Sequence, residues 1–141
     1  MSQIVGRPLL GLMINSGATV RILNINTKNL AKYTKSADVV ICATGQINLL
    51  NGSDLKSGCT VIDVGENHNS NGKLVGDVDF NSAKKVAGKI TPVPGGVGPM
   101  TIATLMRQTV QLCKLQHKYV GNGKLVESNF LYFGIYWNAC G

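Results

Sequence analysis

Residues 91–101 read Thr-Pro-Val-Pro-Gly-Gly-Val-Gly-Pro-Met-Thr, and this stretch decides the fold. It holds three of the chain's four prolines, which fix the backbone and lack an N–H, so it predicts a stiff loop. We expect a short strand over 87–91 before it and a helix beginning near Met100 after it. Such a loop is where α/β proteins bind ligands. On composition alone, a tight connection without a ligand is an equally good interpretation.

Strand-like and helical stretches alternate along the rest of the chain. Apolar runs at 39–44 and 60–64 are typical of strands buried on both faces. This alternation predicts an α/β fold, a doubly wound, Rossmann-like parallel sheet with helices on both faces. The first strand is missing, because a turn at Gly6 opens the chain, and no G-x-G-x-x-G occurs. The pattern predicts a further strand at 18–23 and helices at 8–16 (closed by Gly17), at 28–37 (capped by Thr27), at 80–87 (between Asp79 and Gly88) and at 100–113.

Four glycine positions fall where the predicted strands end or the following helices begin. They are Gly6, Gly45, Gly65 and the group Gly95–Gly98. Carboxyl ends of parallel strands meet at one edge, where such sheets bind ligands. We therefore expect these glycines to border one crevice.

Composition narrows the class of protein. The net charge of +7 is spread along the chain without a basic run interleaved with aromatic residues, so we predict no nucleic-acid partner. The four cysteines and two histidines have no metal-ligand spacing, and we predict no metal site. We also expect no membrane partner and a soluble, intracellular protein, because the longest apolar run near the end, 130–137, is too short to span a bilayer.

Four motifs resemble one known family. Ser2-x-x-Val5-Gly6-x-Pro8, Val61-Ile-Asp-Val-Gly65, Lys73-Leu-Val-Gly-Asp77 and the 91–101 loop are similar to the methylenetetrahydrofolate dehydrogenase/methenyltetrahydrofolate cyclohydrolase family. The resemblance runs from about residue 2 to about residue 116. It implies that 1–117 form an NAD(P)-binding domain, and that 118–141 are an apolar tail outside the family.

The resemblance also implies an activity. Enzymes of this family pass a hydride from 5,10-methylenetetrahydrofolate to the nicotinamide of NADP or NAD, and water then opens the methenyl product to 10-formyltetrahydrofolate. The intact family implies a folate substrate, a homodimer and a cytoplasmic location, with a mitochondrial one as the alternative.

Position by position, the resemblance implies two sets of binding residues. Those on the cofactor are Ser2, Gly6, Ile25, Gly45, Val64, Gly65, Glu66 and Thr101. Those on the folate side of the cleft are Pro94, Gly95, Gly96, Val97, Gly98, Pro99, Met100 and again Thr101, which could bond to either ligand.

The chain departs from the family pattern at several places. No Y-x-x-x-K spacing occurs, so we predict no catalytic residue and a chain close to inactive alone. Ile25 would give a 2′-phosphate no polar partner, and the choice between NAD and NADP stays open. Glu66 would place a negative charge near the cofactor, and the turn at Gln46 lacks the family's proline. A non-catalytic nucleotide- or folate-binding partner module is the alternative function.

Overall fold

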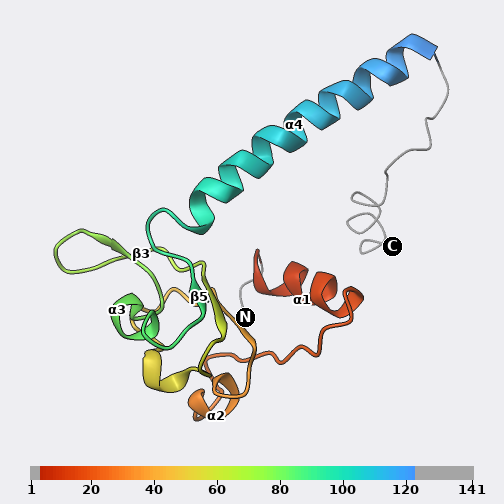
Figure 1. Cartoon of the computed structure of the whole chain (residues 1–141). Coiled ribbons are helices and arrows are strands. Elements are labelled where there is room, and N and C mark those ends of the chain that lie inside the picture. Colours follow the sequence, from red (N-terminus) through yellow and green to blue (C-terminus); the bar gives the residue numbers. More distant parts are fainter. Residues whose placement is uncertain (1–3, 123–141) are drawn as a thin grey trace. The chain divides into compact units, whose positions relative to one another are not determined.

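The computed structural model describes residues 4–122, with side chains described up to residue 116 (Figure 1). The described chain divides after Thr101 into two compact units. The elements in chain order are α1 (Gly6–Asn15), α2 (Ala31–Thr34), β1 (Val39–Cys42), the 3-10 helix η1 (Gly52–Asp54), β2 (Thr60–Asp63), β3 (Asn67–His68), β4 (Leu74–Val75), α3 (Phe80–Ala83), β5 (Lys89–Ile90) and α4 (Val97–Asn122).

A three-stranded parallel sheet in the order β1-β2-β5 confirms the predicted α/β class. Val39 of β1 pairs with Thr60 of β2, and Thr60 pairs with Lys89 of β5. A small antiparallel hairpin, β3–β4, falls within the turn-rich stretch after β2. In this sheet β1 is an edge strand, and the carboxyl ends of all three strands lie on the same side.

The core packs against one face of the sheet. Its buried side chains are Val40, Cys42, Leu50, Leu55, Cys59, Val61, Val78 and Ala83. The prediction that the strand at 39–44 is buried on both faces was wrong, because Val39 is 43% exposed while Val40 is 7% exposed. Elements α2 and α3 both contact η1, and the three lie together at one end of the sheet in Figure 1. The described residues therefore fill one layer of core rather than two.

The predicted strand at 18–23 was also wrong. This run is extended but pairs with no strand in the described chain, and its alternate side chains Val20 and Ile22 are 36% and 45% exposed. An extended run becomes a strand only when a neighbour takes its backbone N–H and C=O groups. The first element of the described residues is α1.

The structure confirms some of the predicted helix boundaries and contradicts others. Gly17 adopts φ +79° and donates its N–H to the Ile14 carbonyl, which confirms it as the residue that closes α1. Asp79 caps α3 as predicted, although α3 ends at Ala83. Thr27 does not cap α2: its Oγ1 accepts from the Asn24 N–H instead. The capping prediction failed there because α2 is a single turn beginning four residues later.

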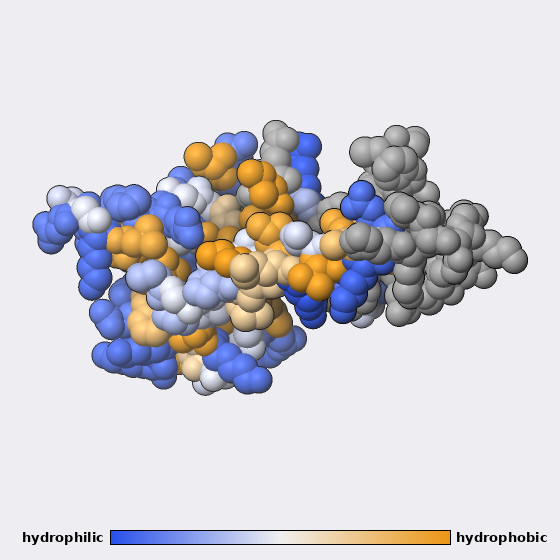
Figure 2. Space-filling view, turned by 90° about the horizontal axis from the view of Figure 1, so that it is seen from above, coloured by the Kyte–Doolittle hydropathy of each residue, from blue (hydrophilic) through white to orange (hydrophobic). Residues whose placement is uncertain are grey.

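The last helix, α4, begins at Val97, three residues earlier than predicted, so 97–99 were wrongly assigned to the loop. Pro99 is tolerated because it lies in the first turn, where a backbone N–H has no helical partner. Large apolar side chains of α4 are exposed: Leu105 is 63% and Met106 is 68% exposed. Orange patches in Figure 2 mark apolar surface of this kind.

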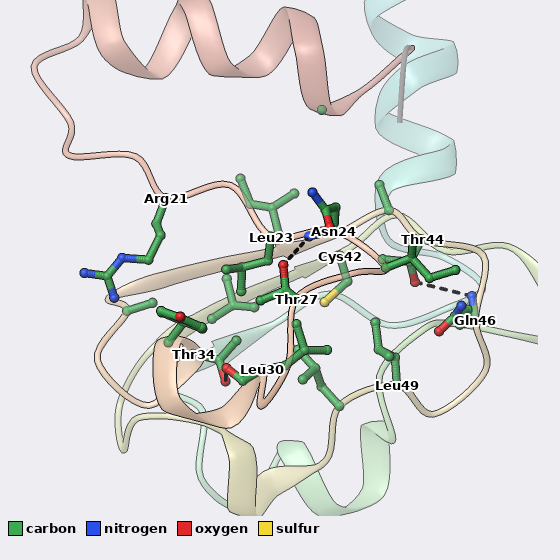
Figure 3. Close-up of a pocket in the computed structure, with 18 of the residues that line it drawn as sticks. Arg21, Leu23, Asn24, Thr27, Leu30, Thr34, Cys42, Thr44, Gln46 and Leu49 are labelled. Carbon is green, nitrogen blue, oxygen red and sulfur yellow. Dashed lines mark hydrogen bonds between the residues drawn. The ribbon is translucent and has the colours of Figure 1, made fainter. Parts of the chain in front are cut away.

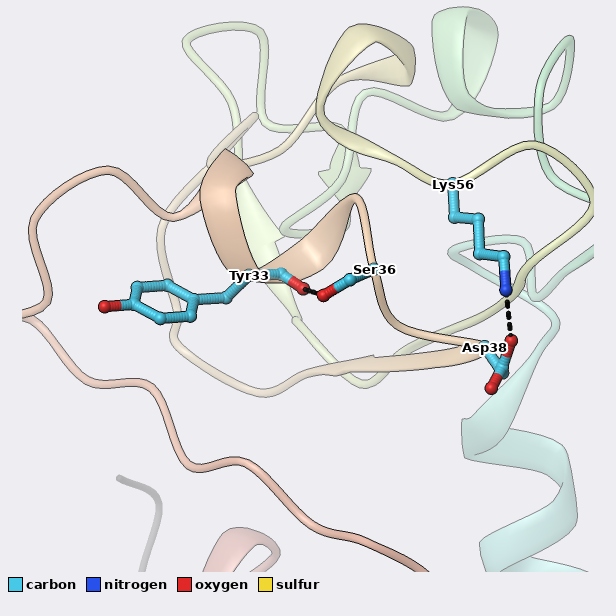
Figure 4. Close-up of polar contacts among 4 residues, drawn as sticks. All are labelled: Tyr33, Ser36, Asp38 and Lys56. Atoms are coloured by element: carbon cyan, nitrogen blue, oxygen red, sulfur yellow. Dashed lines mark hydrogen bonds and ion pairs between the residues drawn. The ribbon is translucent and has the colours of Figure 1, made fainter.

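A surface ion pair precedes β1. Lys56 Nζ lies 2.6 Å from Asp38 Oδ1, and Ser36 Oγ donates to the Tyr33 carbonyl nearby (Figure 4). The hydrogen bond and charge of Lys56 lower the pKa of Asp38, but both side chains are largely solvated. Exposed pairs of this kind add little stability.

None of the helices in the described part of the chain combines the length and apolar character needed to span a bilayer.

Candidate functional site

Two buried carboxylates, Asp63 and Asp77, organise the carboxyl ends of the parallel strands. Asp63 is the last residue of β2 and is 3% exposed, whereas Asp77 follows β4 and is fully buried. A buried carboxylate is costly unless hydrogen-bond donors surround it. Each of these two has its own set of donors.

Asp63 is surrounded by backbone N–H groups. Its Oδ1 accepts from Gly65 at 2.9 Å and from Asp77 at 3.1 Å, and its Oδ2 accepts from Val78 at 2.9 Å. The Asp63 backbone N–H donates to Thr91 Oγ1 at 2.8 Å, which ties the end of β2 to the residue after β5. Asp63 thus fixes the turn after β2 and the segment that precedes Asp77.

Asp77 reaches in the other direction, to the residues after β1. Its Oδ2 accepts from the Thr44 N–H at 2.6 Å, from Thr44 Oγ1 at 2.8 Å and from the Gly45 N–H at 3.1 Å. Its Oδ1 accepts from Asn67 Nδ2 at 2.9 Å. Burial raises the pKa of Asp77, but these hydrogen bonds together outweigh burial and hold the pKa below its ordinary value. The carboxylate is therefore charged and fully partnered.

Two glycines make room for these carboxylates. A methyl group added at Gly65 would overlap Asp77 Oδ1, and one added at Gly76 would overlap Asp63 Oδ2. Each aspartate therefore occupies the space beside the glycine that flanks the other aspartate. This close packing gives Gly65 a structural reason to be glycine, independent of any ligand.

A cavity of about 720 Å³ lies between the extended run after α1 and the edge strand β1 (Figure 3). Leu23, Leu30 and Leu49 give it apolar walls, with Thr44 and Gln46 at one end. Cys42 also lines it, and burial, followed by the charges of Asp63 and Asp77, raises the pKa of its thiol to about 12. The volume is within the usual range for small-molecule sites, about 300–1,000 Å³. The thiol stays protonated and is a wall of the cavity, not a nucleophile.

The proline- and glycine-rich segment lies beside the turn after β2. A methyl group built on Gly98 would come within 3.8 Å of Glu66 Oε1, and one on Gly76 would come within 2.9 Å of Val93 Cγ2. The peptide bond between Val93 and Pro94 is cis. A series of neighbouring residues therefore runs from Gly45, whose N–H donates to Asp77, through Gly65, which packs on Asp77, to Glu66, whose side chain lies near Gly98.

The structure brings some of the predicted site residues together. Gly6, Ile25 and Gly45 line the same cavity. Val64, Gly65 and Glu66 follow β2, and the Glu66 side chain lies near Gly98. Pro94, Gly95, Pro99 and Met100 are exposed, and Gly96, Val97 and Gly98 are partly buried. Ser2 lies outside the described residues.

Several predicted backbone contacts are already used within the protein. The N–H groups of Gly45 and Gly65 donate to Asp77 and Asp63, so neither is left for a ligand. The Thr101 hydroxyl donates to the Val97 carbonyl at 3.0 Å, which leaves its oxygen as an acceptor. These positions can offer a ligand surface and acceptors rather than N–H donors.

Sequence reasoning missed Asp63, Asp77 and Asn67. The available signal was an aspartate at the end of an apolar run, which is a costly place for a charge and therefore indicates a buried network. In the described residues, no group of three or more His, Cys, Asp and Glu side chains is placed to hold a metal ion.

Comparison with known proteins decides the family. Residues 1–117 match the model of the tetrahydrofolate dehydrogenase/cyclohydrolase, NAD(P)-binding domain. The chain belongs to this family. Its relatives include the bifunctional protein FolD of Lactiplantibacillus plantarum, which is 57% identical over 113 residues. That match covers 80% of this chain and 40% of the relative, so the chain spans about two fifths of the length of such proteins.

Solved structures of this family share the fold of the chain. The bifunctional enzyme FolD from Campylobacter jejuni, a methylenetetrahydrofolate dehydrogenase/cyclohydrolase, is 51% identical with a TM-score of 0.79, over 82% of this chain and 41% of that one. The Trypanosoma brucei enzyme, solved with NADP cofactor and inhibitor, is 38% identical with a TM-score of 0.76, over 86% and 42% of the two chains.

Proposed function

We propose that the chain is the cofactor-binding part of a methylenetetrahydrofolate dehydrogenase/methenyltetrahydrofolate cyclohydrolase. The observation that carries the proposal is the series of neighbouring residues from Gly45 through Asp77, Gly65 and Glu66 to Gly98, in a domain of this family. This observation supports a single cleft, with the cofactor bound near Gly45 and folate bound near Gly98. We assign residues 1–117 to the domain and 118–141 to a segment outside it.

The residues present fit a nicotinamide cofactor. The cavity is large enough for part of a dinucleotide and combines apolar walls with polar groups at its end. Bound NADP or NAD would supply the hydride acceptor. Gly6, at the start of α1, would place helix N–H groups toward the phosphates, and Ser2 would lie beside it. Ile25 would border the adenine ribose, and Gly45, Val64, Gly65, Glu66 and Thr101 the rest of the cofactor.

The 94–101 segment is proposed as the folate side of the cleft. Three residues before this segment, Thr91 is hydrogen-bonded to Asp63, and from Val97 onward the segment is part of α4. Pro94, Gly95, Gly96, Val97, Gly98, Pro99, Met100 and Thr101 would thus present a rigid surface to 5,10-methylenetetrahydrofolate. A rigid surface lowers the entropy cost of aligning the methylene bridge with the nicotinamide. The intact enzyme is proposed to be a cytoplasmic homodimer.

Ligand titration tests this function. Calorimetry with NAD, NADP and folate should show nucleotide binding by the purified chain. An assay of NAD(P)-dependent oxidation should show little turnover of methylenetetrahydrofolate, because the sequence has no Y-x-x-x-K pair. Binding without turnover is also what a non-catalytic partner module would give. Mixing the chain with an intact family enzyme separates the two, since a partner module should alter that enzyme's activity. Failure to bind any of the three ligands contradicts both functions.

A further inference from the structure

Asp77 joins two turns that come from different strands. Through Oδ2 it holds Thr44 and Gly45, which follow β1, and through Oδ1 it holds Asn67, which follows β2. Its side chain also packs on Gly65, so tightly that a Cβ there would overlap it. These turns are the two that the proposed function places beside the cofactor.

We propose that Asp77 is a positioning residue, whose carboxylate locks the Thr44–Gly45 turn and the Gly65–Asn67 turn into the single geometry that binds the nicotinamide cofactor. Asp77 itself is fully buried and is not among the residues that line the cavity, so it acts through the turns. The cofactor part of this inference rests on the proposed function.

The charge of Asp77 is what suits it to this task. A carboxylate only accepts hydrogen bonds, and here its four partners are all donors. A neutral amide at this position could keep its oxygen toward Thr44 and Gly45, but its NH₂ would then face the NH₂ of Asn67. The Asn67 amide must then turn over to present its oxygen, and every one of these contacts becomes a hydrogen bond between neutral groups. Hydrogen bonds to a charged group are also stronger than neutral ones.

Exchanging the two side chains provides a stringent test. Asp77→Asn removes the charged acceptor and makes the Asn67 amide turn over to pair with the new NH₂, whereas Asn67→Asp leaves two carboxylates facing each other. The double variant Asp77→Asn/Asn67→Asp restores one donor and one acceptor across the 2.9 Å contact. Rescue by the double variant therefore reports the specific contact rather than general damage to the fold.

The first readout needs no ligand. Amide hydrogen exchange at residues 44–46 and 65–67 should be about tenfold or more faster in each single variant, since a hydrogen bond to a charged group is lost or weakened. The double variant should return to within about threefold of wild type. Val61→Ala is the matched control: it opens a cavity next to Asp63 in β2 and lowers global stability, but it should leave exchange in these turns unchanged relative to the rest of the sheet.

The second readout is the Kd for NAD and for NADP, measured by calorimetry. It should weaken about tenfold in the single variants, recover in the double variant and stay near wild type in Val61→Ala. Should Asp77→Asn fail to fold, Thr44→Val removes Thr44 Oγ1, which donates to Asp77 and accepts from the Gln46 N–H, so amide exchange at 44–45 is its readout and should change in the same direction at smaller size.

The possible outcomes separate this inference from the proposed function. Folded single variants with wild-type exchange at 44–46, or a double variant worse than both singles, overturn the inference even if NAD(P) binds. Wild type binding neither nucleotide contradicts the proposed function, and it removes the cofactor role of Asp77 with it. Binding by wild type that is unaffected in the single variants overturns only the positioning role.

Discussion

At the scale of single residues, the site depends on close contact between glycines and carboxylates. Gly65 and Gly76 are buried against Asp77 and Asp63, and neither has a positive φ. Their lack of a side chain is therefore needed for space and not for backbone conformation. Gly11, on the exposed surface of α1, has no atom within 4 Å of the position of a Cβ.

This difference predicts opposite effects for the same substitution. Gly65→Ala should lower the free energy of unfolding by about 1–3 kcal/mol, because the new methyl group displaces the Asp77 carboxylate. Gly11→Ala should raise it by about 0.5–1 kcal/mol, because alanine loses less backbone entropy in a helix. Urea denaturation of both variants measures the two changes. A neutral Gly65→Ala would mean that the carboxylate is not held where the structure places it.

The low pKa of Asp77 predicts a pH dependence of stability. A carboxyl group whose native pKa is below its unfolded value of 3.8 contributes stability that is complete above that value and is lost as pH falls through the native pKa. Urea midpoints measured from about pH 6 to about pH 2 should therefore decline on the acid side. Asp77→Asn should flatten that decline. Asp38→Asn is the surface control, and an equal flattening there would contradict the assignment to Asp77.

The residue types at the site were only partly predictable from sequence. The glycines were found because strand ends and turn residues leave a clear pattern. Asp63 and Asp77 were missed because their donors are backbone N–H groups distant in sequence, and no spacing rule reports such partners. The pattern indicated a glycine after β2, but the contact that explains Gly65 required the fold.

At the scale of elements, short helices depend on their caps. Asp79 accepts from the N–H groups of Asn81 and Ser82, and α3 has only one turn. So short a helix gains little from its own propensity. The last residue of α3, Ala83, is nevertheless part of the core, so the cap also stabilises the packing of Ala83 in that core.

Loss of this cap should be measurable. Asp79→Ala should lower the free energy of unfolding by about 1 kcal/mol, whereas Asp79→Ser should retain most of it, since serine is also a good cap. Thermal and urea unfolding of the two variants would compare them. Equal losses in both would indicate that the charge of Asp79, rather than its capping geometry, stabilises α3.

Elements were predictable where local signals and tertiary packing agree. The runs at β1 and β2 are apolar, and they pair in the structure. The run at 18–23 carries the same β-prone pattern, but a strand needs a neighbour, and the edge of β1 is separated from it by the cavity. The helix start at Val97 was not predicted, because Pro99 in its first turn is, in the sequence alone, typical of a loop.

At the scale of the whole molecule, the described chain has one core. Leu50 is 4% exposed and belongs to that core, whereas Leu105 on α4 is 63% exposed. Leu50→Ala should therefore cost about 2–5 kcal/mol of unfolding free energy. Leu105→Ala should change it by less than about 0.5 kcal/mol. Urea denaturation of the purified chain distinguishes them, and a large loss in Leu105→Ala would show that α4 is covered in solution.

The parallel register of the sheet has a consequence for how the chain folds. Partners in β1 and β2 lie about 20 residues apart in sequence, and those in β2 and β5 about 30 apart, so no ladder of this sheet forms by a local turn. Among the strand pairs of the described residues, only the β3–β4 hairpin closes over a short loop. We therefore expect the two long crossovers to limit the rate of folding and the hairpin to form on a faster timescale than the sheet.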